Sequence, residues 1–289
     1  AQLSFNTQQS GGVFANGGIS LVARDGGRLG RSGTLASSAA IALEGPRFET
    51  AGEVLSAGGP LSFTGNTLVN AGLAAAQTVV VNGRLENEAG GQMSAASVEV
   101  RGTTLNRGEI GGGTVVLADA VSNAGTIVGD RVAVGGDLLN EGKLGGGDFS
   151  FTGSKLVNAG QLAARAVGVT AVSMDNRGLL QGERVDLQLA GALGNSGVIE
   201  SAGTMTVVAD ALGNSGTVHA GSGGSIRVTQ GVVNDGGRLS AVEGLGIVSG
   251  ASLSNRGGRI LAGGDLAVQL AGDLIGAGLA AANRDLQVK

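Results

Sequence analysis

The sequence predicts an all-β fold, a right-handed parallel β-helix (β-solenoid) of about fourteen coils with about 19 residues per coil. Three observations predict it. A short motif centred on Asn recurs at intervals of 17 to 21 residues, with a mean of 18.5. Apolar residues alternate with polar or small ones, which is typical of strands that bury one face. Gly, 57 of the 289 residues, clusters between these runs, where we expect corners.

The repeat is clearest in LVNAGLAAA at residues 68–76 and in LVNAGQLAA at residues 156–164. In ten of eleven copies Leu, Val or Met lies two residues before the Asn, and Thr104 is the exception. Gly lies two residues after the Asn in ten of the eleven. The eleven anchor residues are Asn70, Asn87, Asn106, Asn123, Asn140, Asn158, Asn176, Asn195, Asn214, Asn234 and Asn255.

Weaker copies place Arg31, Thr50 and Gly276 at the anchor position, so we expect regular coils over residues 31–289. Residues 1–30 keep Gly and the alternation but lose the Asn, and should form irregular N-terminal coils of the same solenoid. A unit this short cannot bury its own apolar face, so the units must stack. We therefore expect a single elongated domain, with the right-handed connections that parallel strands strongly favour.

Parity predicts the direction of the anchor side chain. Leu156, Asn158 and Leu162 share one parity, so in an extended strand the Asn faces inward with the apolar residues. A buried amide needs hydrogen-bond partners, and Asn residues at the same corner of stacked coils can supply them to one another. The prediction is an Asn ladder. The alternative is that these Asn residues tolerate a left-handed corner and point to solvent.

Side chains for catalysis or metal binding are scarce. The single histidine, His219, follows a Gly corner and has no evident catalytic partner, and no nucleotide-binding or nucleophile-elbow motif occurs. Three GGD tripeptides do not recur in every coil, as a calcium-binding β-roll would require. The sequence therefore predicts no catalytic, cofactor-binding or metal-binding residue and no cofactor.

Charge and hydropathy also limit the partners. The net charge is −4 with no basic run, so nucleic acid is not expected as a partner. No apolar run approaches the roughly 18 residues of a membrane span, so we expect no membrane insertion. The position after the anchor carries both signs, which favours a solvated surface over a glycan-binding stripe. Its charged residues include Arg107, Arg177, Arg256, Glu88, Glu141 and Asp235.

An Ala- and Gly-rich repeat of this length with Asn-x-Gly corners resembles the shaft of filamentous haemagglutinin and related exoproteins of bacterial two-partner secretion, closest in texture to the Bordetella members. The resemblance covers residues 31–289. It implies a rigid shaft of a secreted or surface-exposed bacterial adhesin, exported through an outer-membrane transporter. The implied partners are host-cell receptors or glycans. The NPNG- and NPNL-type motifs of the family's secretion domain are not recognisable, so we expect an internal segment.

Three alternatives remain open. Contact-dependent inhibition toxins have similar shafts. A β-helical polysaccharide lyase would need long loops to wall a cleft, and the intervals between anchors never exceed 21 residues. Leucine-rich repeats also carry an Asn ladder, but their Leu precedes the Asn by three residues and their units are mostly longer. The leading interpretation is a shaft that is not an enzyme.

Overall fold

The computed structural model describes residues 2–3 and 11–289 of the chain. Residues 1 and 4–10, which belong to the predicted N-terminal coils, lie outside the described residues. The described residues form strands and turns without a helix, and the strands pair in parallel. The fold is a right-handed parallel β-solenoid of about 15 turns, which confirms the predicted fold class.

The chain divides into two compact units, residues 1–146 and 147–289. Strand β16 (Lys143–Asn158) contributes residues to both units. The other strands of the first unit are β1 (Gln2–Leu3), β2 (Gly12–Ala15), β3 (Ile19–Val22), β4 (Gly27–Leu29), β5 (Thr34–Ser37), β6 (Ile41–Glu44), β7 (Arg47–Thr50), β8 (Glu53–Asn70), β9 (Leu73–Asn87), β10 (Gln92–Val100), β11 (Thr104–Asn106), β12 (Glu109–Leu117), β13 (Val121–Asn123), β14 (Thr126–Val134) and β15 (Leu138–Asn140).

The second unit continues the same pattern, in most coils as three separate short strands. Its strands are β17 (Gln161–Asn176), β18 (Leu179–Gly182), β19 (Arg184–Leu189), β20 (Ala192–Asn195), β21 (Val198–Ser201), β22 (Met205–Ala209), β23 (Ala211–Asn214), β24 (Thr217–Ala220), β25 (Gly224–Val228), β26 (Val232–Val233), β27 (Arg238–Ala241), β28 (Leu245–Ser249), β29 (Leu253–Ser254), β30 (Arg259–Ala262), β31 (Leu266–Leu270), β32 (Leu274–Ile275), β33 (Leu279–Ala282) and β34 (Leu286–Val288).

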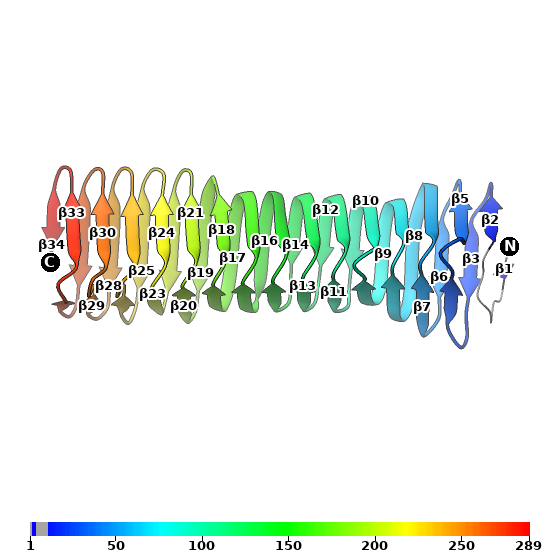
Figure 1. Ribbon diagram of the computed structural model, residues 1–289, viewed down its shortest axis with the longest axis horizontal. Helices are drawn as coiled ribbons and strands as arrows, with labels where there is room; N and C mark the ends of the chain where they lie inside the picture. Colours follow the sequence, from blue (N-terminus) through cyan, green and yellow to red (C-terminus); the bar gives the residue numbers. More distant parts are fainter. Residues whose placement is uncertain (1, 4–10) are drawn as a thin grey trace. The chain divides into compact units, whose positions relative to one another are not determined.

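Each coil has three faces, and equivalent strands pair from one coil to the next within each unit (Figure 1). We call the face that carries the anchor Asn the anchor face; in the second unit it contains β20, β23, β26, β29 and β32. The second face contains β18, β21, β24, β27, β30 and β33. The third face contains β19, β22, β25, β28, β31 and β34.

In the first unit some strands bend through the corners. Strand β8 pairs with β9 along all three faces, and the register shifts between Ser56 and Pro60 and between Thr64 and Thr67, where the chain turns. Strands β2, β3 and β4 already follow the three-face pattern, since β2 pairs with β5, β3 with β6 and β4 with β7. The described part of residues 1–30 is therefore in register with the coils that follow.

The core is built from inward-facing aliphatic columns. In the coil of Asn123, the inward residues Val121, Ile127, Val132 and Val134 are at most 3% exposed. Burial alternates along the strands, as in the third-face strand β19, because successive side chains of a strand point to opposite faces. The chain has no Trp or Tyr, so columns of Val, Leu, Ile and Met with a few Phe fill the interior at every level.

Candidate functional site

The anchor Asn side chains of the first unit form a continuous hydrogen-bonded series. Asn70 Nδ2 donates to Asn87 Oδ1 (2.8 Å), and Asn87 Nδ2 to Asn106 Oδ1 (2.7 Å). Asn106 Nδ2 donates to Asn123 Oδ1 (2.7 Å), and Asn123 Nδ2 to Asn140 Oδ1 (2.8 Å). All five side chains are fully buried. The structure therefore places these side chains inward. All four hydrogen bonds run in the same direction, because each Asn donates to the anchor Asn of the following coil.

The second unit repeats the arrangement. Asn158 donates to Asn176 (2.7 Å), and the same Nδ2-to-Oδ1 bond then runs through each later anchor to Asn255. These side chains are at most 3% exposed. Among the described residues only glycines have a positive φ, so no anchor Asn adopts a left-handed corner. The geometry is that of the inward ladder and differs from the solvent-facing alternative.

Ladder amides also donate to backbone carbonyls. Asn106 Nδ2 also donates to the carbonyl of Thr126 (3.1 Å), and Asn176 Nδ2 to that of Val198 (3.0 Å). These carbonyls belong to the strand that follows the corner of the next coil. One Asn thus joins the anchor face to the second face across two coils, and both halves of the buried amide are satisfied.

The ladder of the first unit begins at Asn70, whose Oδ1 accepts no hydrogen bond. Thr50 is the register partner of Asn70, occupies the anchor position and is 2% exposed. Neither Thr50 Oγ1 nor Asn70 Oδ1 has a hydrogen-bond partner. Thr104, the one polar residue two positions before an anchor, also has a buried hydroxyl without a partner. The sequence pattern marked both positions as exceptions, and the structure shows what each exception leaves unsatisfied.

In coils such as those of Asn123 and Asn195, close backbone packing requires the Gly two residues after the anchor. A Cβ on Gly125 would lie 2.1 Å from the carbonyl oxygen of Gly108, and a Cβ on Gly197 would lie 2.2 Å from that of Gly178. Neither Gly125 nor Gly197 has a positive φ. At these corners the carbonyl oxygen of the equivalent Gly in the preceding coil therefore leaves no space for a Cβ. The sequence alone did not reveal this contact.

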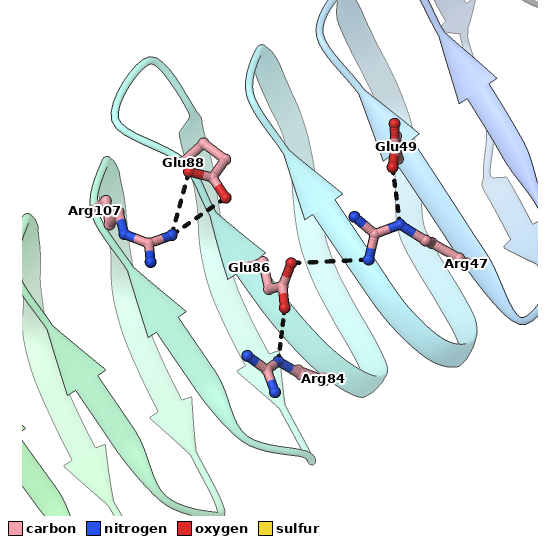
Figure 2. Close-up of polar contacts among 6 residues, drawn as sticks. All are labelled: Arg47, Glu49, Arg84, Glu86, Glu88 and Arg107. Atoms are coloured by element: carbon pink, nitrogen blue, oxygen red, sulfur yellow. Dashed lines mark hydrogen bonds and ion pairs between the residues drawn. The ribbon is translucent and has the colours of Figure 1, made fainter.

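Charged side chains pair both within a strand and across coils on the outer surface of the anchor face. In the first unit Arg84 contacts Glu86 at 2.9 Å, and Arg47 reaches over one intervening coil to Glu86 at 3.9 Å (Figure 2). At the next corner Arg107 contacts Glu88 at 3.3 Å (Figure 2). The arginines are about half exposed, so each pair contributes little to stability. The face carries both signs and has few free charges.

Comparison with known families decides the classification. A family model described as the haemagglutinin repeat matches residues 14–89, 73–142, 143–257 and 222–289. The chain belongs to the haemagglutinin-repeat family. The matches confirm the predicted resemblance to filamentous haemagglutinin and begin at residue 14, before the predicted start at residue 31. Comparison with curated proteins and with solved structures found no significant match.

An open depression lies on the second unit of the haemagglutinin-repeat solenoid. Its volume is about 340 Å³, and it lies over Gly194 and Gly213, where the outer surface of the anchor face lacks side chains. Asp175 and Asp235 lie at its margin. Asp175 contacts Arg177 at 2.6 Å, and Asp235 accepts hydrogen bonds from Ser254 Oγ and from a backbone N–H. Both carboxylates are engaged, and the depression has no evident acid-base pair.

Hydrogen bonds lower the pKa of the Asp235 carboxyl. The hydrogen bond from Ser254 Oγ (2.7 Å), followed by that from the backbone N–H of Arg256 (2.9 Å), lowers the pKa of the Asp235 carboxyl. The carboxylate therefore favours the folded state near neutral pH, and this contribution is lost as the pH falls through the folded-state pKa. The effect stabilises a corner and indicates no reaction.

His219 lies on the outer surface of the second face. Its register partners are Glu200 and Ser240, and its Nδ1 lies 3.0 Å from Ser240 Oγ. No group of three or more His, Asp or Glu side chains in the described part of the chain could hold a metal ion. Within the same residues there is no helix long and apolar enough to cross a membrane. Haemagglutinin repeats on a β-solenoid fit an adhesin-type shaft.

Proposed function

We propose that this chain is a shaft segment of a secreted or surface-exposed bacterial adhesin that mediates or presents attachment to host cells. The observation that carries the proposal is the family match over residues 14–289 on coils of nearly constant length. Constant coils leave no inserted loops to wall a catalytic cleft, which supports a role without catalysis. The partners we propose are host-cell receptors or glycans and, during export, an outer-membrane two-partner secretion transporter.

Attachment by such a surface should depend on many copies. Neighbouring coils present different outward residues, as at the register partners Glu200 and His219, so no large uniform surface is available to one partner. Weak contacts that act together raise the apparent affinity by several orders of magnitude when a first contact holds the others close. We therefore expect feeble binding in solution and strong binding at high surface density.

The test compares the chain free in solution with the chain coupled to beads at increasing density. We expect host-cell attachment to rise steeply with density, whereas beads carrying the heat-unfolded chain should not attach. Absence of attachment at every density would contradict the adhesive part of the proposal. Turnover of pectin or another acidic polysaccharide by the purified chain would contradict the non-catalytic part and favour a lyase.

A further inference from the structure

One Asn of the first unit, outside the ladder, directly precedes a glycine within a strand. Asn82 in β9 is followed by Gly83, whereas none of the eleven anchor Asn residues is followed by Gly. A glycine has no side chain to hinder attack by its backbone nitrogen on the preceding side-chain amide, so Asn-Gly pairs lose that amide faster than other Asn pairs. The other Asn-Gly pair of the sequence, Asn16-Gly17, lies outside the strands. Asn82 is therefore the intrinsically most reactive Asn of the regular coils.

Few contacts hold the Asn82 side chain. Its Nδ2 donates to Thr64 Oγ1 of the preceding coil at 3.4 Å, which is a long and weak hydrogen bond, and its Oδ1 has no hydrogen-bond partner. The ladder amides of Asn87 and Asn106 donate at 2.7 Å and are fully buried. The ladder thus restrains its amides, whereas rotation of the Asn82 amide towards Gly83 breaks one weak hydrogen bond.

The corner at Gly83 requires glycine and is shorter than the equivalent corner of the preceding coil. Gly83 has a φ of +152°, and a Cβ there would lie 2.2 Å from a backbone oxygen of the preceding coil. Thr64 pairs with Asn82 and Thr67 with Arg84, so two residues connect these pairs in the preceding coil and Gly83 alone connects them here. The packing of the corner thus keeps the Asn-Gly pair, and the preceding coil shows that a longer backbone fits the same corner.

A carboxylate at residue 82 would lie beside arginines. Asn82 and Arg101 each follow a register-paired Val, so they occupy neighbouring positions in adjacent coils, about 4.8 Å apart at the backbone. Arg84, two residues after Asn82, is exposed and pairs with Glu86 at 2.9 Å (Figure 2). Opposite charges at neighbouring positions of paired strands stabilise a sheet. A negative charge at residue 82 is therefore favourable and would compete with Glu86 for Arg84.

We infer that Asn82 is a site of spontaneous deamidation, which places a carboxylate on the outer surface of the folded solenoid. The backbone nitrogen of Gly83 gives its proton to a solvent base and attacks Asn82 Cγ. The Cγ–Nδ2 bond breaks, and the amide nitrogen takes a proton from water and leaves as ammonia. Water then opens the resulting succinimide ring, at Cγ to give aspartate or at the main-chain carbonyl to give isoaspartate. This inference goes beyond the proposed adhesive function and does not depend on it.

The experiment incubates the full chain at physiological temperature and follows each Asn by peptide mass spectrometry, with electron-transfer fragmentation to distinguish aspartate from isoaspartate. The chain carries Asn16→Gln, so that Asn82-Gly83 is its one remaining Asn-Gly pair. The same chain unfolded in guanidinium chloride gives the rate of the unhindered pair. Asn66, at the same corner of the preceding coil but followed by Thr67, is the slow reference within the molecule. The matched variant adds Asn82→Gln, which keeps an amide but would have to form a larger ring.

We expect Asn82 in the folded chain to convert at a rate within tenfold of the rate in the unfolded chain, at least tenfold faster than Asn66, and faster as the pH rises. Anion exchange should isolate a species with one added negative charge, which the Asn82→Gln variant does not form at that rate. This species should unfold at the temperature of the unconverted chain, because the corner accepts the carboxylate.

A folded-state rate more than tenfold below that of the unfolded chain would overturn the inference, because the corner would then protect the amide. Conversion of Asn66 at a rate within tenfold of that of Asn82 would also overturn it, because the reaction would then not be specific to this site. A lower unfolding temperature of the isolated converted chain would contradict the part of the inference that places the carboxylate on a folded solenoid.

Discussion

At the scale of the residue, the anchor position needs a side chain that donates and accepts in one direction. Asn meets this need because its amide has one acceptor oxygen and two donor hydrogens. Asp lacks the donor, and Thr is too short to reach the next coil, as the unpartnered Thr50 Oγ1 and Asn70 Oδ1 show. The recurrence of Asn is thus explained by hydrogen bonding inside the solenoid.

The first prediction concerns an interior member of the ladder. Asn106→Leu should lower the free energy of unfolding by about 1–3 kcal/mol, because Asn123 Oδ1 and Asn87 Nδ2 each lose a buried partner. Asn66, an exposed Asn of the same unit outside the ladder, provides the control, and Asn66→Leu should be nearly neutral. Urea unfolding of both variants measures the difference. Equal stability of the two variants would contradict a buried ladder.

The second prediction uses the polarity of the ladder. Asn106→Asp keeps the shape but places an acceptor opposite Asn123 Oδ1, which should destabilise the folded state at neutral pH. Only the protonated acid can donate there, so the pKa of the new carboxyl should be higher in the folded state. The deficit relative to wild type should therefore shrink as the pH falls from about 7 to about 4. A deficit that is constant over this range would argue against the assigned donor direction.

The third prediction concerns the unsatisfied start of the ladder. Thr50→Asn should raise the free energy of unfolding by about 1 kcal/mol, because the new amide can donate to Asn70 Oδ1 from the register-paired position. Thr50→Val removes the unpartnered hydroxyl without adding a donor. It therefore separates the effect of losing the buried hydroxyl from the effect of gaining a hydrogen bond to Asn70 Oδ1. Thermal unfolding of both variants is the measurement. An Asn variant no more stable than the Val variant would show that the ladder does not extend to this coil.

At the scale of the element, the corners are set by contact between successive backbones. At Gly125 and its equivalents the chain passes so close to the preceding coil that a Cβ has no space. The corners after Asn234 and Asn255 are one residue longer; there Gly236 (φ +71°) and Gly257 (φ +62°) adopt left-handed conformations. Two kinds of corner therefore use Gly for different physical reasons.

The fourth prediction follows from the close contact. Gly125→Ala should lower the free energy of unfolding by about 3 kcal/mol, because the new Cβ would lie 2.1 Å from a backbone oxygen that can move only with its coil. Gly213→Ala in β23 is the matched control, since its Cβ would meet no atom within 4 Å. That change should be neutral or slightly stabilising. Chemical denaturation distinguishes the two, and a harmless Gly125→Ala would contradict the corner geometry.

The strands were predictable from sequence, while several contacts between coils were not. Period-two alternation and parity give the strands and the inward direction of Asn158 because both depend on local geometry. The clash that requires Gly125 depends on the distance between two coils, which no single repeat encodes. The ion pair between Arg47 and Glu86 skips a coil, so it also depends on side-chain reach. The spacing of residues in the sequence therefore predicts neither the contact at Gly125 nor the ion pair between Arg47 and Glu86.

At the scale of the whole molecule, a chain without Trp, Tyr or Cys gains its stability by repetition. Each unit places aliphatic residues at equivalent inward positions and connects successive coils by backbone hydrogen bonds, to which Asn side chains add wherever an anchor Asn is present. A short coil cannot bury its own apolar face, so neighbours supply the core. This is consistent with membership of the haemagglutinin-repeat family and with the proposed shaft, in which similar coils present varied outer surfaces.

The central claim is that a buried Asn ladder runs through the coils of each unit. Hydrogen exchange of the Asn side-chain amides, followed by nuclear magnetic resonance on chain labelled at Asn, tests it most directly. Interior ladder amides such as those of Asn106 and Asn195 should exchange far more slowly than the exposed Asn66 amide, because exchange requires opening of the solenoid. Equally fast exchange of ladder and exposed amides would contradict the account.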